Sequence, residues 1–224
     1  MSQDCFIIAI DGPSGAGKSS TSKMVAERLG LAYLDSGALY RAVGLAVLES
    51  EVDLADEAEL TRLLANTEIE LFDGGRRARL NGRDVTDLIR TERVSAAASR
   101  TSTMDAVRRR LLELQRSAAR PPGLVAEGRD MGSVVFPDAE LKVFLDADPD
   151  ERARRRAFER GQGDEHSLET IARDMAERDS RDRSRLLAPL RPAPDAVVLN
   201  STAMLLEEVV EWVIAEAKRR KSFE

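Results

Sequence analysis

The chain has 224 residues, of which 42% are hydrophobic and 33% charged, and its formal net charge is −6 at pH 7. This length suits one α/β domain with inserted parts, and the acidic balance gives no general attraction to nucleic acid or to an anionic membrane. No apolar stretch approaches the roughly 18–20 residues that a membrane helix needs, and the N-terminus lacks a signal-peptide pattern. We therefore expect neither nucleic acid nor a membrane as a partner.

Cysteine and histidine are nearly absent. Cys5 is the single cysteine and His166 the single histidine, which excludes an internal disulfide and a zinc site of the usual Cys/His kind. Cys5 stands in an apolar run and is expected to pack as a small hydrophobe, whereas His166 stands in a polar stretch expected to be a loop. A cytoplasmic setting is the expected one.

Short apolar runs alternate with helical stretches, which is typical of a parallel sheet with crossover helices. Five runs are predicted to be core strands: 6–10, 32–34, 124–126, 141–145 and 196–199. A polar or glycine residue follows each run. Because ligands of such sheets bind beyond the carboxyl ends of the strands, we expect these polar residues to converge on one site.

The segment after the first strand matches the phosphate-binding pattern G-x-x-x-x-G-K-[ST] and precedes a helix predicted over residues 18–29. The residues expected to hold the nucleotide are Gly12, Pro13, Ser14, Gly15, Ala16, Gly17, Lys18, Ser19 and Ser20. In this motif, backbone N–H groups surround the phosphates and the Lys18 ammonium contacts the β- and γ-phosphates. The Ser19 hydroxyl is a ligand of Mg²⁺. The motif predicts binding of a nucleoside triphosphate.

Two segments depart from the alternation of strands and helices. Residues 68–86 alternate in polarity around two turns and predict a small antiparallel unit. Residues 151–164 form an arginine-dense helix that ends in Gly161-Gln162-Gly163. We expect both segments to be inserts that close over bound substrates.

The phosphate loop by itself also serves switches, motors and transferases. A GTPase switch is expected to carry Asn-Lys-x-Asp, but this chain has no Asn-Lys pair. Arginines suited to further anionic groups follow the predicted strands, and on a helix Arg178, Asp182 and Arg185 share a face with Arg181 beside them. A solvated face with salt bridges, a kinase for another small acceptor and a nucleotide-binding switch remain alternatives.

At this level of detail the chain resembles the bacterial-type cytidylate kinases, which are nucleoside monophosphate kinases, from about Phe6 to Ala217. Besides the phosphate loop, the resemblance is carried by Leu-Asp-Ser-Gly-Ala-Leu-Tyr-Arg at 34–41, Glu-Gly-Arg-Asp-Met-Gly at 127–132, Val-Phe-Pro-Asp-Ala at 135–139 and Arg-Asp-Ser-Arg-Asp-Arg at 178–183. The chain departs from the family in two places: Ser19-Ser20 follow Lys18, where Gly-Thr or Ser-Thr is common, and Glu127 replaces a frequent Asp.

The resemblance implies an α/β P-loop kinase fold, with a five-stranded parallel sheet flanked by helices, a small antiparallel monophosphate-binding insert and a short helical lid. It implies one domain whose core comprises about 1–35, 120–150 and 166–224, with the insert at about 36–119 and the lid at about 151–165. A monomer is expected.

The implied reaction transfers the γ-phosphoryl group of ATP to CMP or dCMP, with UMP as the alternative acceptor. By resemblance, Ser36, Arg41 and Arg129 hold the acceptor phosphate, while Ser99, Arg108 and Asp130 contact the cytosine. Arg178 and Asp182 contact the acceptor sugar. A structural role stays open for these positions. Ser36 can cap a helix, Asp130 can be an ion-pair partner, and Arg108 stands in a run of three arginines that is partly a solvated face.

The same resemblance implies that the catalytic residues are Lys18, Arg129, Arg181 and Arg185. Phosphoryl transfer needs alignment and positive charge more than acid–base chemistry, which agrees with a chain that has one histidine. Mg²⁺ is expected on the Ser19 hydroxyl, with Glu127 orienting a metal-bound water. Arginines of 154–156 are expected to help stabilise the transferring group.

Overall fold

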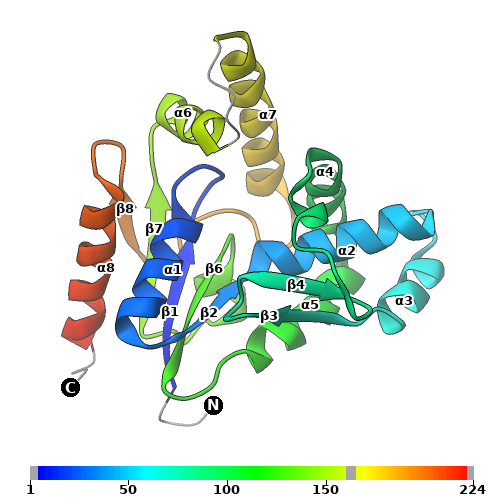
Figure 1. The fold of residues 1–224 in the computed structure, drawn as a ribbon, viewed down its shortest axis with the longest axis horizontal. Helices are drawn as coiled ribbons and strands as arrows, with labels where there is room; N and C mark the ends of the chain where they lie inside the picture. Colours follow the sequence, from blue (N-terminus) through cyan, green and yellow to red (C-terminus); the bar gives the residue numbers. More distant parts are fainter. Residues whose placement is uncertain (1–4, 160–164, 221–224) are drawn as a thin grey trace. The chain divides into compact units, whose positions relative to one another are not determined.

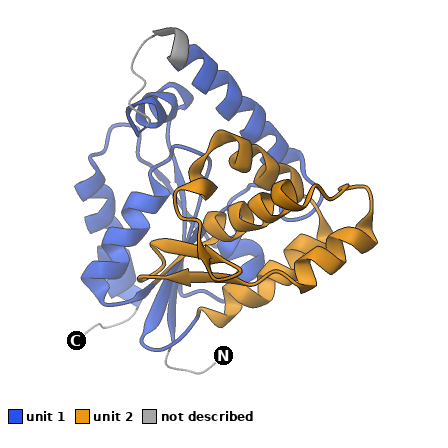
Figure 2. Ribbon diagram, turned by 45° about the vertical axis from the view of Figure 1, so that its right-hand side comes forward, with its two compact units in different colours: residues 1–32, 119–224 blue, residues 33–118 orange. Residues whose placement is uncertain are grey.

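The computed structural model describes residues 5–159 and 165–220 (Figure 1). The chain divides into two compact units, one made of residues 1–32 and 119–224 and the other of residues 33–118 (Figure 2). Within the part of the chain so described, no helix has the length and apolar character needed to cross a membrane.

A five-stranded parallel sheet has four of its strands in the first unit, while β2 begins there at Ala32 and continues into the second unit. Its strands, in the order in which they lie side by side, are β2 (Ala32–Asp35), β6 (Gly123–Gly128), β1 (Phe6–Asp11), β7 (Leu141–Asp146) and β8 (Val197–Asn200). The five predicted strands are thus confirmed. β1 and β6 are buried along their whole length, as expected of central parallel strands. Their register sets Ile10 opposite Glu127 and Asp11 opposite Gly128, so both strands end at the same level.

The helices of the first unit are α1 (Lys18–Leu29), α6 (Pro149–Glu159), α7 (Glu165–Ser184) and α8 (Leu206–Arg220), together with the one-turn π-helix η2 (Met131–Val135). α1 has the predicted bounds and packs beside β6 and α8, which Figure 1 shows next to it. Gly30 ends α1 with a left-handed conformation, and its N–H donates to the carbonyl of Glu27. His166 lies in α7, so the expected loop at this residue is wrong.

The segment expected to be a lid includes most of α6. Ala153 and Ala157 of α6 pack against Ile171 and Met175 of α7 in a small apolar cluster, so the two helices form a pair. Gly161-Gln162-Gly163, where the expected lid turns, lies outside the described residues.

The second unit consists of helices and a three-stranded antiparallel sheet. Its elements are α2 (Ser36–Ser50), α3 (Glu57–Ala65), β3 (Ile69–Phe72), β4 (Arg77–Leu80), β5 (Arg83–Asp84), the short η1 (Leu88–Arg90), α4 (Glu92–Thr101) and α5 (Asp105–Ser117). The sheet order is β3-β4-β5, and both predicted turns are present, so the antiparallel unit expected at 68–86 is confirmed.

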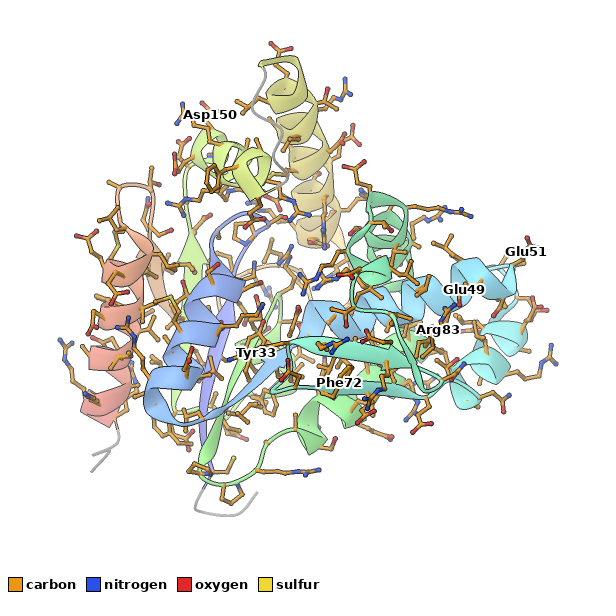
Figure 3. The ribbon with its side chains drawn as sticks, in the orientation of Figure 1. Tyr33, Glu49, Glu51, Phe72, Arg83 and Asp150 are labelled. Carbon is orange, nitrogen blue, oxygen red and sulfur yellow. The ribbon has the colours of Figure 1, made fainter. Side chains whose placement is uncertain are left out.

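An ion pair joins this small sheet to α2, and a cation–π contact joins two of its strands. Arg83 of β5 forms an ion pair with Glu49 of α2, and both side chains are labelled in Figure 3. On β3, the Phe72 ring lies under the guanidinium of Arg79 at 3.9 Å, a cation–π contact. Beneath the sheet, Ala78 and Leu80 of β4 belong to the apolar core of the unit.

Gly44 allows α2 and α4 to approach closely within this unit. A Cβ added to Gly44 would lie 2.7 Å from the backbone nitrogen of Ala98 in α4. We expect Gly44→Ala to lower the free energy of unfolding by about 1–3 kcal/mol, because overpacking outweighs the helix-propensity gain of about 0.5–1 kcal/mol. Urea denaturation measures this change.

Ser50→Ala, at the exposed end of the same helix, is the control and should change the free energy of unfolding by less than about 0.5 kcal/mol. A net stabilisation by Gly44→Ala would show that α2 and α4 can separate without cost.

Candidate active site

The loop between β1 and α1 approaches the carboxyl end of β7 closely. Gly12 has a φ of 150°, and a Cβ added there would lie 2.0 Å from the carbonyl oxygen of Leu145 in β7. Only glycine fits such a contact. The loop therefore lies directly above the end of the sheet, with the N-terminus of α1 opening from it, an arrangement suited to polyphosphate.

Lys18 is the first residue of α1 and is buried. Its ammonium donates a hydrogen bond of 2.7 Å to the carbonyl oxygen of Pro13 in the loop. Burial, together with the positive charges of Arg129 and Arg178, lowers the pKa of Lys18 to about 7, although the nearby Glu127 carboxylate opposes the shift. Additional negative charge at this position would raise the pKa again.

Ser19 and Glu127 bring a hydroxyl and a carboxylate together at the edge of the loop. The Ser19 Oγ donates to a Glu127 carboxylate oxygen at 2.9 Å, and Glu127 is buried near the end of β6. Hydroxyl and carboxylate oxygens are the ligands that Mg²⁺ prefers, so this pair fits such an ion. Among the described residues no cluster of three or more His, Cys, Asp or Glu could hold a metal. A magnesium ion here would therefore take its other ligands from phosphate oxygens and water.

A buried network of arginines and aspartates follows β6. The Arg129 Nε donates to Asp182 at 2.9 Å, and its Nη1 donates to the carbonyl oxygen of Gly12 at 3.0 Å. The Arg185 guanidinium lies 3.8 Å from an Asp130 carboxylate oxygen and 3.9 Å from one of Asp182. The network thus joins the residues after β6 to the end of α7 and to the phosphate loop. Asp130 does form the ion pair that its alternative interpretation predicted.

Opposing effects act on the pKa of Asp182. Burial raises this pKa, but the positive charges of Arg129, Arg178 and Arg185 outweigh burial, so it lies below its ordinary value. Asp182 is therefore ionised at neutral pH. Its negative charge offsets part of the positive charge that the arginines bring into the buried site.

Arg181 makes none of the contacts given above for this network. Its side chain is exposed, and its Nε donates to the main-chain oxygen of Glu177. Asp182 and Arg185, by contrast, turn into the protein. Helical spacing places Arg181 beside Asp182 and Arg185, but its side chain lies at the solvent-exposed edge of that face.

Asp11 organises the backbone of this candidate site, although the sequence analysis did not include it among the site residues. Its two carboxylate oxygens accept hydrogen bonds of 2.8 Å from the N–H groups of Met131 and Gly132, at the start of η2. Burial raises the pKa of Asp11 to about 6, although these two hydrogen bonds oppose the shift. Asp11 thereby fixes the chain immediately after Arg129 and Asp130. A carboxylate at the last position of a buried strand was the available signal.

Within the second unit, Asp35 organises the start of α2. One of its carboxylate oxygens accepts from the Ala38 N–H at 2.9 Å, and the other pairs with Arg41 at 3.0 Å. Asp35 is therefore the N-cap of α2, and the alternative that Ser36 is a helix cap is wrong. Asp35 holds the Arg41 guanidinium over the first turn, where its Nη1 lies 3.1 Å from the position that a Cβ on Gly37 would take.

Ser99 and Arg108 also lie in the second unit, on α4 and α5. The Ser99 side chain is buried, and its hydroxyl makes no hydrogen bond to any residue that the structure describes. Arg108 donates to the carbonyl oxygen of Ser102 at 3.3 Å, and its guanidinium lies 5.9 Å from the centre of the Tyr40 ring. These contacts orient Arg108, which the sequence had placed in a run of three arginines.

The three arginines of 154–156 differ in their surroundings. Arg155 donates to both the hydroxyl and the carbonyl oxygen of Ser201, and its Nη1 lies 3.9 Å from where a Cβ on Gly17 would be. All three form ion pairs with glutamates of their own helix, and for Arg154 and Arg156 these are the contacts that the structure gives. Arg155 is thus the member of this run that approaches the phosphate loop.

Comparisons with known proteins agree with these features. The family model described as cytidylate kinase matches residues 8–219. A cytidylate kinase of Pseudomonas aeruginosa (strain LESB58) is 48% identical over 219 residues, with 96% of each chain covered. A cytidylate kinase of Yersinia enterocolitica is 46% identical over 222 residues, covering 98% of this chain and 96% of the relative.

Among solved structures, an uncharacterized protein of Eubacterium ventriosum covers 96% of this chain and 98% of its own, with a TM-score of 0.51 and 14% identity. At this identity the likeness concerns the fold alone. The family model and the close relatives, which span nearly all of the chain, carry the assignment. The chain belongs to the cytidylate kinase family.

Proposed function

We propose that this protein transfers the γ-phosphoryl group of ATP to CMP or dCMP, giving ADP and CDP or dCDP. The observation that carries the proposal is the phosphate loop with buried Lys18 beside the Arg129–Asp182–Arg185 network, in a chain of the cytidylate kinase family. A kinase for UMP or another small acceptor is not favoured, because the relatives that span nearly the whole chain are cytidylate kinases.

The donor site consists of the loop 12–20 in this proposal. The loop amides and Lys18 bind the ATP phosphates, and Mg²⁺ is held by the Ser19 hydroxyl with Glu127 acting through a water. The 2.9 Å contact between Ser19 and Glu127 supports this assignment, since one ion can satisfy both oxygens. Mg²⁺ neutralises phosphate charge during transfer.

The acceptor CMP is held in three parts. Ser36, Arg41 and Arg129 bind its phosphate, while Arg178 and Asp182 bind the sugar. Ser99, Arg108 and Asp130 contact the cytosine. The buried Ser99 hydroxyl supports its role, because an unpaired buried hydroxyl costs about 1–3 kcal/mol unless a ligand satisfies it.

Transfer requires positive charge around the moving phosphoryl group. Buried Lys18, the buried Arg185 side chain and the partly buried Arg129 supply it, and Arg181 joins them if substrate binding draws its exposed side chain inward. No general base is needed, because the acceptor is already a phosphate oxyanion. Within one domain, the core, the acceptor insert at 36–119 and the lid at 151–165 exclude water from this step. We place the protein in the cytoplasm as a monomer.

An acceptor panel tests the reaction. With ATP and Mg²⁺, a coupled assay of ADP formation should give kcat/KM values for CMP and dCMP at least about tenfold above those for UMP and AMP. The reason is that the Asp130 carboxylate accepts from the exocyclic amine of cytosine but opposes the carbonyl oxygen of uracil. ATP binding without transfer to any monophosphate would falsify the proposal.

Substitutions of Arg185 and Arg181 test which arginine stabilises the transferring phosphoryl group. We expect Arg185→Ala to lower kcat by at least about a hundredfold, as loss of an arginine that stabilises phosphoryl transfer does. Arg185→Lys keeps the buried charge and should retain the fold, which circular dichroism checks. Arg181→Ala is the comparison: an equal loss of kcat establishes it as catalytic, and normal turnover removes it from that role.

The lowered pKa of Lys18 predicts proton uptake on binding ATP. At pH 8 a group with a pKa of about 7 is mostly neutral, and the phosphates raise its pKa, so each binding event should take up about one proton. Calorimetry in buffers of different ionisation enthalpy measures this number. Uptake should vanish in Lys18→Met. An observed enthalpy independent of the buffer would show that Lys18 is already charged in the free protein.

A further inference from the structure

A buried ion pair joins α6 to α7 outside the groups assigned to ATP and CMP. The Arg152 Nη1 lies 2.5 Å from an Asp179 carboxylate oxygen, and the side chains are 7% and 1% exposed. Desolvating two charges is costly, so such a pair persists only where further hydrogen bonds complete it. One of these is internal, since the Arg152 Nε donates to the carbonyl oxygen of Ala147 at 3.0 Å.

The remaining hydrogen bonds of the pair go to the phosphate loop. Arg152 Nη1 donates to the carbonyl oxygen of Ser14 at 3.0 Å, and the other Asp179 oxygen accepts from the Ser14 N–H at 3.4 Å. The pair therefore engages the main chain of Ser14 through both its N–H and its C=O. These contacts fix the loop four residues before Lys18.

Gly15, the next residue of the loop, packs closely against α6 and α7. Gly15 has a φ of 74°, and a Cβ added there would lie 2.7 Å from the carbonyl oxygen of Arg152 and 2.8 Å from the Met175 Cε. Met175 belongs to the apolar cluster that joins α6 and α7. Ser14 and Gly15 are thus held by charge and by close contact against one helix pair.

We propose that Arg152 and Asp179 are positioning residues of the donor site. By holding Ser14 and Gly15, they set where the following amides and Lys18 meet the polyphosphate, and so they determine the affinity for the donor. They act through the loop rather than by touching substrate. The inference rests on the proposed function in taking ATP as the donor.

Asp179→Asn tests the proposal most directly, because it preserves shape but removes the charge that balances Arg152. We expect the KM for ATP and its dissociation constant by calorimetry to rise at least tenfold, with the KM for CMP changing less than threefold. Asp174→Asn, an exposed carboxylate on the same helix, is the control and should leave all three values unchanged. Equal changes in both KM values for Asp179→Asn would overturn the proposal.

A double variant separates positioning from stability. Arg152→Met with Asp179→Leu replaces the pair by apolar side chains and leaves no buried charge unpaired, so Tm should stay within a few degrees of the wild type. The KM for ATP should nevertheless stay at least tenfold raised, because the bonds to Ser14 are gone. A wild-type KM for ATP in this variant would reduce the pair to a structural role. If the double variant does not fold, the KM for ATP is measured in Arg152→Lys instead. It should again be at least tenfold raised, since a single ammonium cannot reproduce the contacts of the guanidinium.

Measuring CMP phosphorylation and ATP affinity separately in the wild-type protein distinguishes failure of this inference from failure of the proposed function. Failure of the wild type to phosphorylate CMP overturns the proposed function, whereas ATP affinity measured by calorimetry still decides the role of Arg152 and Asp179. Unchanged ATP affinity in Asp179→Asn, with an active wild type, overturns the inference alone.

Discussion

Burial of positive charge is the constraint on which this structure depends. Lys18 and Arg185 carry cationic side chains into the interior of the first unit, and Arg129 places a partly buried guanidinium beside them. Each is costly to desolvate, and the structure balances them with buried carboxylates at short range. The lowered pKa of Lys18 shows that this balance is incomplete at the phosphate loop. Groups held this way are suited to an anionic ligand that supplies the missing negative charge.

The parallel sheet makes this arrangement possible. Because β1 and β6 end level with each other, Asp11 reaches the N–H groups of Met131 and Gly132 while Glu127 reaches Ser19. Two carboxylates on adjacent strands thus serve different purposes. Asp11 fixes the backbone after Arg129 and Asp130. Glu127 accepts a hydrogen bond from the Ser19 hydroxyl in the first turn of α1.

Carboxylates that orient arginines recur in both units. Asp35 holds Arg41 in the second unit, Asp182 holds Arg129 in the first, and Asp179 holds Arg152 against the phosphate loop. A guanidinium fixed in this way presents its remaining N–H donors in a set direction, at little entropic cost when an anion binds. Electrostatic catalysis depends on such groups being in place before the reaction.

The sequence alone predicted the strands, the bounds of α1 and the antiparallel unit, because each follows from local patterns of polarity and turn residues. It also predicted the family, through motifs whose spacing is contiguous in the chain. It misjudged His166, because a polar stretch can be helical. Helical spacing also left open that the Arg181 side chain is exposed while Asp182 is buried, because spacing does not say which edge of a face meets solvent.

Local patterns contain no information about partners distant in sequence. Asp11 and Gly132 lie 121 residues apart, and Ser14 and Asp179 lie 165 apart, so only the tertiary structure decided which carboxylate meets which backbone group. The sequence by itself determined that a phosphate loop and a supply of arginines are present. The fold decided which of those charges are buried, because burial depends on how strands and helices from separate parts of the chain pack together.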